Sequence, residues 1–276
     1  MKKVIFLALV IMCTTIYPAF AGPAYDHVMK TGVIRCAYIL YPSETERDLV
    51  TGKLSGAVVE MTEEAARLAE LKVEWVAEVG FADMFEGLKS GKYDALCSGL
   101  WETPTRARAA LFTVPTNYGL LFTFVRKEDT RFDKNLRLAN SEDVTVAVLD
   151  GEYGAIVANE SFPKSKKYSL PQLSDMSQLL VAVETGKADI AFLQPSTGQN
   201  YMKNNPGKLR MLENKPVRAM PAPTIAVSPS EQALKNLLDA SFRFMQGSGK
   251  TEEILRKYDP SLSSHYLLAP PYMFSD

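Results

Sequence analysis

The chain has 276 residues, of which 46% are hydrophobic, 10% aromatic and 23% charged, so it can bury one large core or two modest ones. This composition excludes a disordered or fibrous protein. Its 31 basic and 32 acidic residues give a formal charge of -1, which offers no electrostatic basis for binding nucleic acid or an anionic membrane surface. Three Cys and two His are too few for a dedicated zinc or iron–sulfur site, and we expect neither a metal nor a cofactor.

The first 21 residues are typical of a cleaved export signal. Two lysines precede an apolar run from Val4 to Met12, and residues 19–21 read Ala-Phe-Ala, with small residues at the positions that signal peptidase inspects. Pro18 and polar residues interrupt the run, which is too short to span a bilayer comfortably. We therefore expect cleavage after Ala21 and a soluble protein exported to the periplasm.

Two cysteines, Cys36 and Cys97, remain in the mature chain, each inside an apolar segment typical of a buried strand. Export permits a disulfide, but neighbouring parallel strands rarely offer the geometry that a disulfide requires. We expect two buried free thiols, with a disulfide as the alternative.

Strands and helices alternate in the first half of the mature chain. Apolar residues follow one another in the expected buried strands, return at three- and four-residue steps in the helices, and alternate with polar residues in the second strand. In chain order these elements are a strand at 33–40, a helix at 58–71, a strand at 72–79, a helix at 81–88 and a strand at 93–98. This order predicts a parallel sheet with helices on its faces.

The second half repeats the pattern. It predicts strands at 144–149, 167–170 and 188–193, with helices at 151–162 and 175–184 between them. Two further apolar strands at 120–125 and 224–227 flank this unit, and residues 230–258 are helical. If that helical end packs on the first unit, the chain crosses between the units twice. We therefore expect an α/β protein of two lobes, each a mostly parallel sheet flanked by helices, joined by two hinge strands; lobe 1 comprises 22–124 and 225–276, and lobe 2 comprises 125–224.

The loop from Gly99 to Arg108 is the clearest candidate for a ligand site. It follows the third strand, and ligands of open α/β sheets bind beyond the carboxyl ends of the strands. Thr103 is a plausible N-cap with Pro104 at the first helical position, so the loop ends at a helix N-terminus that favours an anion. The planar guanidinium of Arg106 is suited to hold a carboxylate; the alternative is an exposed helix residue or one paired with a neighbouring Glu.

Several short motifs of the mature chain occur in a specific order: GVIR at 32–35, TGKLSG at 51–56, LKSGKYDA at 88–95, TPTRA at 103–107, FTVP at 112–115 and GKAD at 186–189. In this order they resemble the bacterial extracellular solute-binding proteins of family 3, the polar amino-acid receptors of ABC transporters. The resemblance implies a type 2 periplasmic-binding fold, in which two lobes close on a ligand. It also implies a membrane permease of an ABC transporter as the partner.

The resemblance also implies roles for individual residues. The Arg matching Arg106 clamps the ligand carboxylate, aided by main-chain groups near Gly99 and by the turn at Gly151. Trp101 occupies a position where the family commonly has a hydroxyl residue. We expect Trp101 and Tyr41 to form aromatic walls, with ordinary lobe packing as the alternative.

Gln194 stands where the resemblance predicts an acidic partner for the ligand ammonium. A neutral amide cannot supply that charge, so we expect a carboxylate ligand whose amino group is weak, displaced or absent. Glu152 or Asp150 is the candidate replacement. The complete set of expected ligand-binding residues is Arg106, Gly99, Trp101, Thr103, Tyr41, Gly151, Glu152 and Gln194.

These features predict a monomeric binding protein that captures a small carboxylate-bearing solute, an amino acid or related compound, and delivers it to the permease. One alternative is an enzyme of the same fold that resembles cyclohexadienyl dehydratase, with Glu152 as general acid. Another is a sensor that passes the ligand state to a partner. A Ser/His/Asp hydrolase is poorly supported, because neither His27 nor His265 has a Gly-x-Ser-x-Gly neighbour.

Overall fold

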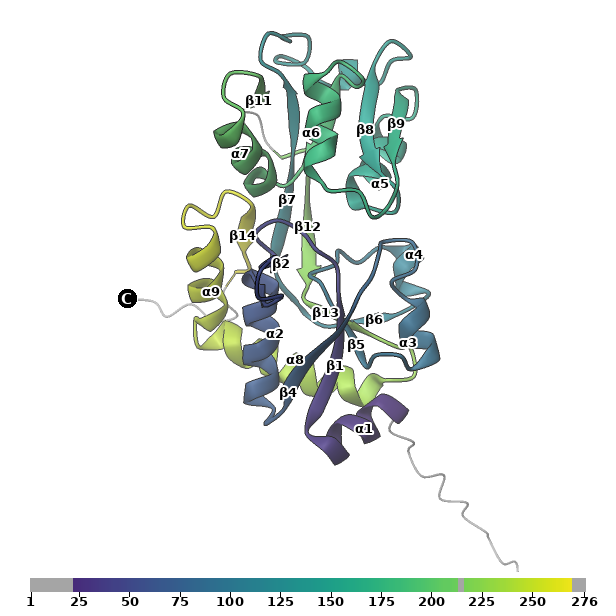
Figure 1. Cartoon of the computed structure of the whole chain (residues 1–276), viewed down its shortest axis with the longest axis vertical. Coiled ribbons are helices and arrows are strands. Elements are labelled where there is room, and N and C mark those ends of the chain that lie inside the picture. The colour runs from purple at the N-terminus through teal and green to yellow at the C-terminus, as the bar shows by residue number, and fades with distance from the viewer. Residues whose placement is uncertain (1–21, 213–215, 270–276) are drawn as a thin grey trace, which may run out of the picture.

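The computed structural model of the chain describes residues 22–212 and 216–269, which form two α/β units joined by extended strands (Figure 1). The predicted export signal and its cleavage site after Ala21 lie outside these residues, as do residues 270–276 of the tail. In Figure 1 the units lie one above the other, with the connecting strands between them. The chain therefore has the two-lobed α/β architecture that its alternating pattern predicts.

Five strands form the sheet of the first unit, in the order β4 (Lys72–Glu78), β1 (Val33–Tyr38), β5 (Ala95–Cys97), β13 (Ile225–Val227) and β6 (Leu111–Phe112). β1 is parallel to both β4 and β5, whereas β13 is antiparallel to both β5 and β6. Because β13 follows the second unit in the chain, two separate chain segments build the first unit.

Helices cover both faces of this sheet. One core cluster joins β1 and β5 to α1 (Pro23–Thr31), α2 (Ala57–Leu68), α8 (Gln232–Gly247) and α9 (Lys250–Tyr258). On the opposite face, α3 (Glu86–Ser90) packs through Leu88 against Leu96 and its neighbours. The helix expected over 230–258 is broken in two at Gly249, whose φ of 77° lies in the left-handed region that favours glycine. None of the described helices is long and apolar enough to cross a membrane.

The second unit is also a sheet between helices. Its main strand order is β11 (Leu209–Met211), β7 (Pro115–Arg126), β10 (Ile190–Leu193), β8 (Thr145–Leu149) and β9 (Lys166–Leu170). Its helices are α5 (Tyr153–Ser161), α6 (Ser177–Glu184) and α7 (Pro195–Asn204), together with the short 3-10 helix η1 (Leu136–Ala139). Apolar residues of α5 form one core cluster, and those of α6 and α7 belong to another.

Strand β7 passes through both units and forms the centre of the connection (Figure 1). β12 (Arg218–Pro223) pairs with its first part on one edge, and β14 (His265–Leu267) pairs with residues 117–119 on the other. The strand expected at 224–227 lies within the first sheet as β13, and β12 is the strand that accompanies β7. β14 arises from a tail whose structure the sequence pattern did not reveal.

A disulfide joins Cys36 and Cys97, so the expectation of two free thiols is wrong. Cys36 pairs with Ala95 across parallel strands β1 and β5, and Cys97 lies two residues further along on the same face of the sheet. This diagonal offset leaves their Cα atoms 5.7 Å apart, within the usual range for a disulfide.

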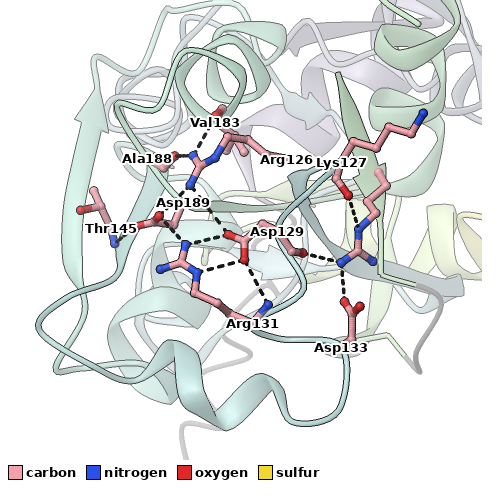
Figure 2. A network of polar contacts seen from close by, with 10 residues as sticks. Arg126, Lys127, Asp129, Arg131, Asp133, Thr145, Val183, Ala188 and Asp189 are labelled. Atoms are coloured by element: carbon pink, nitrogen blue, oxygen red, sulfur yellow. Dashed lines mark hydrogen bonds and ion pairs between the residues drawn. The ribbon is translucent and has the colours of Figure 1, made fainter. Parts of the chain in front are cut away.

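A network of charged residues ties the strands of the second unit together at the end remote from the first unit (Figure 2). Asp189 Oδ1 accepts hydrogen bonds from Arg126 Nη2 at 2.9 Å and from Arg131 Nη2 at 2.6 Å. Its Oδ2 accepts one from the backbone N–H of Thr145 at 2.8 Å. Arg126 Nη1 also donates to the backbone oxygen of Ala188 at 2.6 Å. Because these residues adjoin β7, β8 and β10, one carboxylate fixes the relative positions of three strands.

We predict that Asp189→Asn lowers the free energy of unfolding by about 1–3 kcal/mol, because two guanidinium groups and a backbone N–H lose a charged acceptor. Urea denaturation followed by circular dichroism measures the change. Glu128→Gln, an exposed carboxylate near the same network, is the matched control and should leave the midpoint unchanged. Equal midpoints for Asp189→Asn and wild type would contradict the prediction.

Candidate functional site

A pocket lies between the two units, where the loops after β1 and β5 face the start of α5 and the end of β10. Its lining residues are Ile39, Tyr41, Glu44, Phe81, Ser98, Gly99, Leu100, Trp101, Arg106, Glu152, Tyr153 and Gln194. The pocket therefore occupies the edge at which parallel α/β sheets bind ligands.

The loop after β5 leads into the short helix α4 (Pro104–Ala107). Thr103 caps this helix, because its Oγ1 accepts a hydrogen bond from the backbone N–H of Arg106 at 3.2 Å. Gly99 has φ +61°, and a Cβ there would lie 2.7 Å from Cγ2 of Val58, so the chain requires glycine at this close approach. The N–H of Gly99 donates to the backbone oxygen of Thr224 at 3.0 Å and is therefore already engaged within the protein.

Arg106 is the cation of the pocket wall and is only 7% exposed. Its Nη1 donates to the backbone oxygen of Trp101 at 2.8 Å, and its Nη2 donates to the backbone oxygen of Gly151 in the second unit at 2.9 Å. These bonds use two of the five guanidinium N–H donors. Burial lowers the pKa of Arg106, and the nearby carboxylate of Glu152 opposes that shift. Within the described part of the chain, the other three donors of this buried cation are therefore open to an anionic ligand.

Glu152 faces the pocket from the second unit and is 4% exposed. It is the N-cap of α5, and its Oε2 accepts a hydrogen bond from the backbone N–H of Gly154. Burial raises the pKa of this carboxyl group to about 7, although that hydrogen bond and the charge of Arg106 both favour the ionised form. Glu152 is therefore able to change its protonation state near neutral pH. Asp150, the other candidate acid of this turn, is exposed and does not line the pocket.

Trp101 lies in the pocket wall and also packs between the units. It lines the pocket, and its ring also packs on Tyr153 of the second unit, with centroids 4.6 Å apart and an interplanar angle of 69°. It belongs to the apolar cluster of the second unit together with Leu121 and Phe192, although its chain position is in the first. The indole is therefore a contact between the units as well as a pocket wall.

Tyr41 and Gln194 line the same pocket from opposite units. Burial, followed by the charges of Glu152 and Glu44, raises the pKa of Tyr41 well above its usual value. Gln194 is 7% exposed, and its Oε1 has no hydrogen-bond partner among the described residues. An unpaired buried amide oxygen is costly, so Gln194 is suited to accept a hydrogen bond from a ligand.

Six of the eight expected ligand-binding residues line the pocket: Tyr41, Gly99, Trp101, Arg106, Glu152 and Gln194. Thr103 and Gly151 do not, but both hold Arg106 through hydrogen bonds. The sequence interpretation missed Glu44, Ser98, Phe81 and Tyr153. Glu44 and Ser98 follow strands that end at the pocket, so their position in the chain was a usable signal.

Among the described residues, no group of three or more His, Cys, Asp or Glu side chains is arranged to hold a metal ion. The polar side chains that line the pocket are a guanidinium, two carboxylates, an amide, two phenols, a hydroxyl group and an indole, from Arg106, Glu44, Glu152, Gln194, Tyr41, Tyr153, Ser98 and Trp101. They are suited to hold a small polar molecule by charge and hydrogen bonding.

Comparisons with known proteins agree with this geometry. Residues 41–260, more than half of the chain, match the profile of the bacterial extracellular solute-binding proteins, family 3. A protein of Bacillus subtilis (strain 168), named "Probable ABC transporter extracellular-binding protein YckB", is 34% identical over 106 residues, which are 38% of this chain and 37% of that protein. A "Probable histidine-binding protein" of Campylobacter jejuni is 24% identical over 155 residues, 56% of this chain and 57% of that protein. These matches span less than two thirds of either relative.

Solved structures resemble the whole two-lobed body. The solute receptor for L-cysteine of Neisseria gonorrhoeae has a TM-score of 0.72 at 23% identity, covering 87% of this chain and 94% of that chain. The ancestral amino-acid-binding protein AncCDT-1, described as a precursor of cyclohexadienyl dehydratase, has a TM-score of 0.73 at 23% identity, covering 84% and 97%. These likenesses show the type 2 periplasmic-binding fold. Together with the match over residues 41–260, they establish that the chain belongs to the bacterial extracellular solute-binding proteins, family 3.

Proposed function

We propose that this protein is a periplasmic receptor that binds a small carboxylate-bearing solute between its lobes and delivers it to the permease of an ABC transporter. The observation that carries the proposal is Arg106, a buried cation in the pocket wall with unoccupied donors. A guanidinium holds a carboxylate through two parallel hydrogen bonds, which gives both affinity and orientation. The family and the printed name of the Bacillus subtilis relative support the transport role.

Contacts between the lobes support binding by closure. Arg106 and Trp101 of the first lobe contact Gly151 and Tyr153 of the second. A solute that enters between these groups bonds to both lobes at once, and its binding free energy favours the closed arrangement. Export through the amino-terminal signal, with cleavage after Ala21, would place this monomeric receptor beside a membrane permease.

An amino acid or a related compound is the ligand class that the pocket favours. Arg106 faces a ligand carboxylate, and the carboxylates of Glu44 and Glu152 face a ligand nitrogen. Two relatives named as histidine-binding proteins, from Campylobacter jejuni and Neisseria gonorrhoeae, support the same class. Gln194 stands where an acidic partner for the ligand ammonium is expected. Glu44 would supply that carboxylate from another part of the pocket wall, so the ligand amino group would lie in a displaced position.

Glu152 supports a second candidate function, a dehydratase-like enzyme. A carboxyl group that is buried in the cleft and has a pKa of about 7 is suited to donate a proton to a departing hydroxyl group. The likeness to AncCDT-1 is a likeness of fold alone. Incubation with a 4-hydroxycyclohexadienyl carboxylic acid, followed by ultraviolet absorbance, tests this candidate. Loss of the hydroxyl group as water, with a proton from Glu152, and of the ring carboxylate as carbon dioxide leaves an aromatic ring. Turnover by wild type that is lost in Glu152→Gln would favour the enzyme over the receptor.

We predict that Arg106→Ala weakens solute binding by about 2–5 kcal/mol, or roughly 30- to several-thousand-fold in Kd, because the ligand carboxylate loses its buried cation. Arg106→Lys should also weaken binding, since an ammonium group lacks the paired donors. A thermal-shift panel of the standard amino acids and matched amine-free carboxylates first identifies a ligand, and calorimetry then measures Kd. Arg108→Ala, an exposed residue beside the same helix, is the control. Unchanged affinity in Arg106→Ala would exclude Arg106 as the clamp.

We also predict a pH-dependent effect of Glu152 on stability. Its folded-state pKa of about 7 lies above its ordinary value, so folding favours the protonated form. That contribution is complete below about pH 4.5 and is lost as the pH rises through 7. Wild type should therefore lose stability relative to Glu152→Gln between pH 5 and pH 8, as measured by urea unfolding without ligand. The exposed control Glu142→Gln should show no such trend, and a constant difference between wild type and Glu152→Gln would refute the prediction.

A further inference from the structure

A segment beyond the family match reaches the ligand pocket. The match ends at residue 260, whereas β14 (His265–Leu267) lies against the connecting strand β7 (Figure 1). Ser264, just before β14, is fully buried; its backbone oxygen accepts from the N–H of Leu120 at 3.0 Å, and its Oγ accepts from the N–H of Ser196 at 2.8 Å. These bonds fix the tail at the junction of the lobes and place His265 beside the pocket.

His265 joins the tail to the pocket wall. Its imidazole is 4% exposed, and its Nε2 lies 2.8 Å from Oε1 of Glu44 while its Nδ1 lies 3.2 Å from Oδ2 of Asp259. A carboxylate at each ring nitrogen requires both nitrogens to donate, which is the protonated form of the ring. Burial lowers the pKa of His265, but the two carboxylates outweigh it and raise that pKa to about 9. The ring is therefore a cation at neutral pH.

Backbone groups of the tail also stabilise the ionised form of Asp259, the second carboxylate beside His265. Asp259 accepts from the backbone N–H groups of Ser264 at 2.7 Å and Ser263 at 3.0 Å, in addition to its contact with His265. Burial opposes ionisation, but these hydrogen bonds lower the pKa of Asp259 well below its usual range. Two carboxylates, those of Asp259 and Glu44, therefore face one imidazole ring, so this cluster holds more acidic than basic groups.

Glu44 lines the pocket, so its carboxylate belongs both to this cluster and to the pocket wall. Its loop is held against the start of α2, where the N–H of Val58 donates to the backbone oxygen of Glu44 at 3.0 Å. Gly56 makes this approach possible, since a Cβ at that position would lie 2.3 Å from the same oxygen. Glu44 Oε2 has no hydrogen-bond partner among the described residues, and the unpaired Oε1 of Gln194 lies in the wall of the same pocket. Two acceptor groups in the wall of the pocket thus remain open to a donor.

We propose that His265 is a positioning residue that holds Glu44 as the anionic wall of the pocket, where Glu44 and Gln194 together receive a protonated nitrogen of the ligand. This inference rests on the proposed receptor function and specifies its ligand. Such a ligand carries a carboxylate for Arg106 and a cationic nitrogen for Glu44. A buried carboxylate that has one oxygen paired with His265 and the other open favours a cationic donor over a neutral group in that place, because the donor completes its hydrogen bonding.

The test uses pairs of probes that differ by one cationic nitrogen: L-arginine and L-citrulline, L-lysine and L-norleucine, L-histidine and imidazolepropionic acid, and L-alanine and propionate. Calorimetry measures both affinities of each pair for wild type, Glu44→Gln and His265→Asn. For the pair that wild type binds, the ratio of charged to neutral affinity should fall at least tenfold in Glu44→Gln. It should fall less in His265→Asn, which keeps the carboxylate but loses its fixed position.

Two control variants separate this role from general damage. Ser263→Ala removes a hydroxyl group that donates to Asp259 at 3.1 Å without touching Glu44, and Glu63→Gln removes an exposed carboxylate of α2. Both should keep the wild-type ratio. Circular dichroism checks folding; if His265→Asn does not fold, Glu44→Gln carries the test, because its amide oxygen still accepts from His265.

Each result distinguishes the inference from the receptor function. An unchanged ratio in folded Glu44→Gln overturns the inference, and the receptor function stands if Arg106→Ala still abolishes binding. If wild type binds only the amine-free probes, and Arg106→Ala abolishes that binding, the inference is likewise overturned and the receptor function stands. Binding of no carboxylate probe contradicts the receptor function and this inference together.

Discussion

The structure depends on a single strand that is hydrogen-bonded into both lobes. On one edge of β7, pairing with β12 ends at Leu121 and pairing with β11 begins at Phe124; on the other edge, β14 covers residues 117–119 and β10 begins at Phe122. Both edges therefore change partners close to the bond between Leu121 and Phe122. The lobe closure proposed above would concentrate at this point, because on either side of it the strand is held by ladders within one lobe.

The charged groups buried in the pocket between the lobes impose a second constraint on the structure. Burying an ion is costly unless protein groups compensate it. The carbonyl oxygens of Trp101 and Gly151 compensate Arg106, the N–H of Gly154 compensates Glu152, and His265 compensates Glu44. Each of these groups thus has at least one internal partner and further bonding capacity, so the pocket is arranged in advance and would lose little entropy on binding the proposed solute.

The sequence pattern predicted local structure well and long-range chemistry poorly. Strands and helices could be predicted because their periodicity is local. Arg106 could be predicted because the loop from Gly99 to Arg108, which leads to it, follows a buried strand directly. The disulfide depended on the sheet register between residues 61 positions apart. Glu44 and His265 are 221 positions apart, and no spacing rule relates them. They come together because β14 pairs with the connecting strand β7. No periodicity in the tail sequence predicts that pairing.

The packing of Trp101 on glycine gives the protein an intrinsic optical probe. A Cβ at Gly119 of β7 would lie 2.5 Å from the indole, so the ring occupies the space that any side chain there would fill. The same ring contacts Tyr153 across the lobes. The chain has two tryptophans, and the other, Trp75, lies on β4 beside Tyr38 within the first lobe. The proposed rotation of the lobes about β7 would therefore change the surroundings of Trp101 and leave Trp75 as an internal reference, so that closure would have its own fluorescence signal.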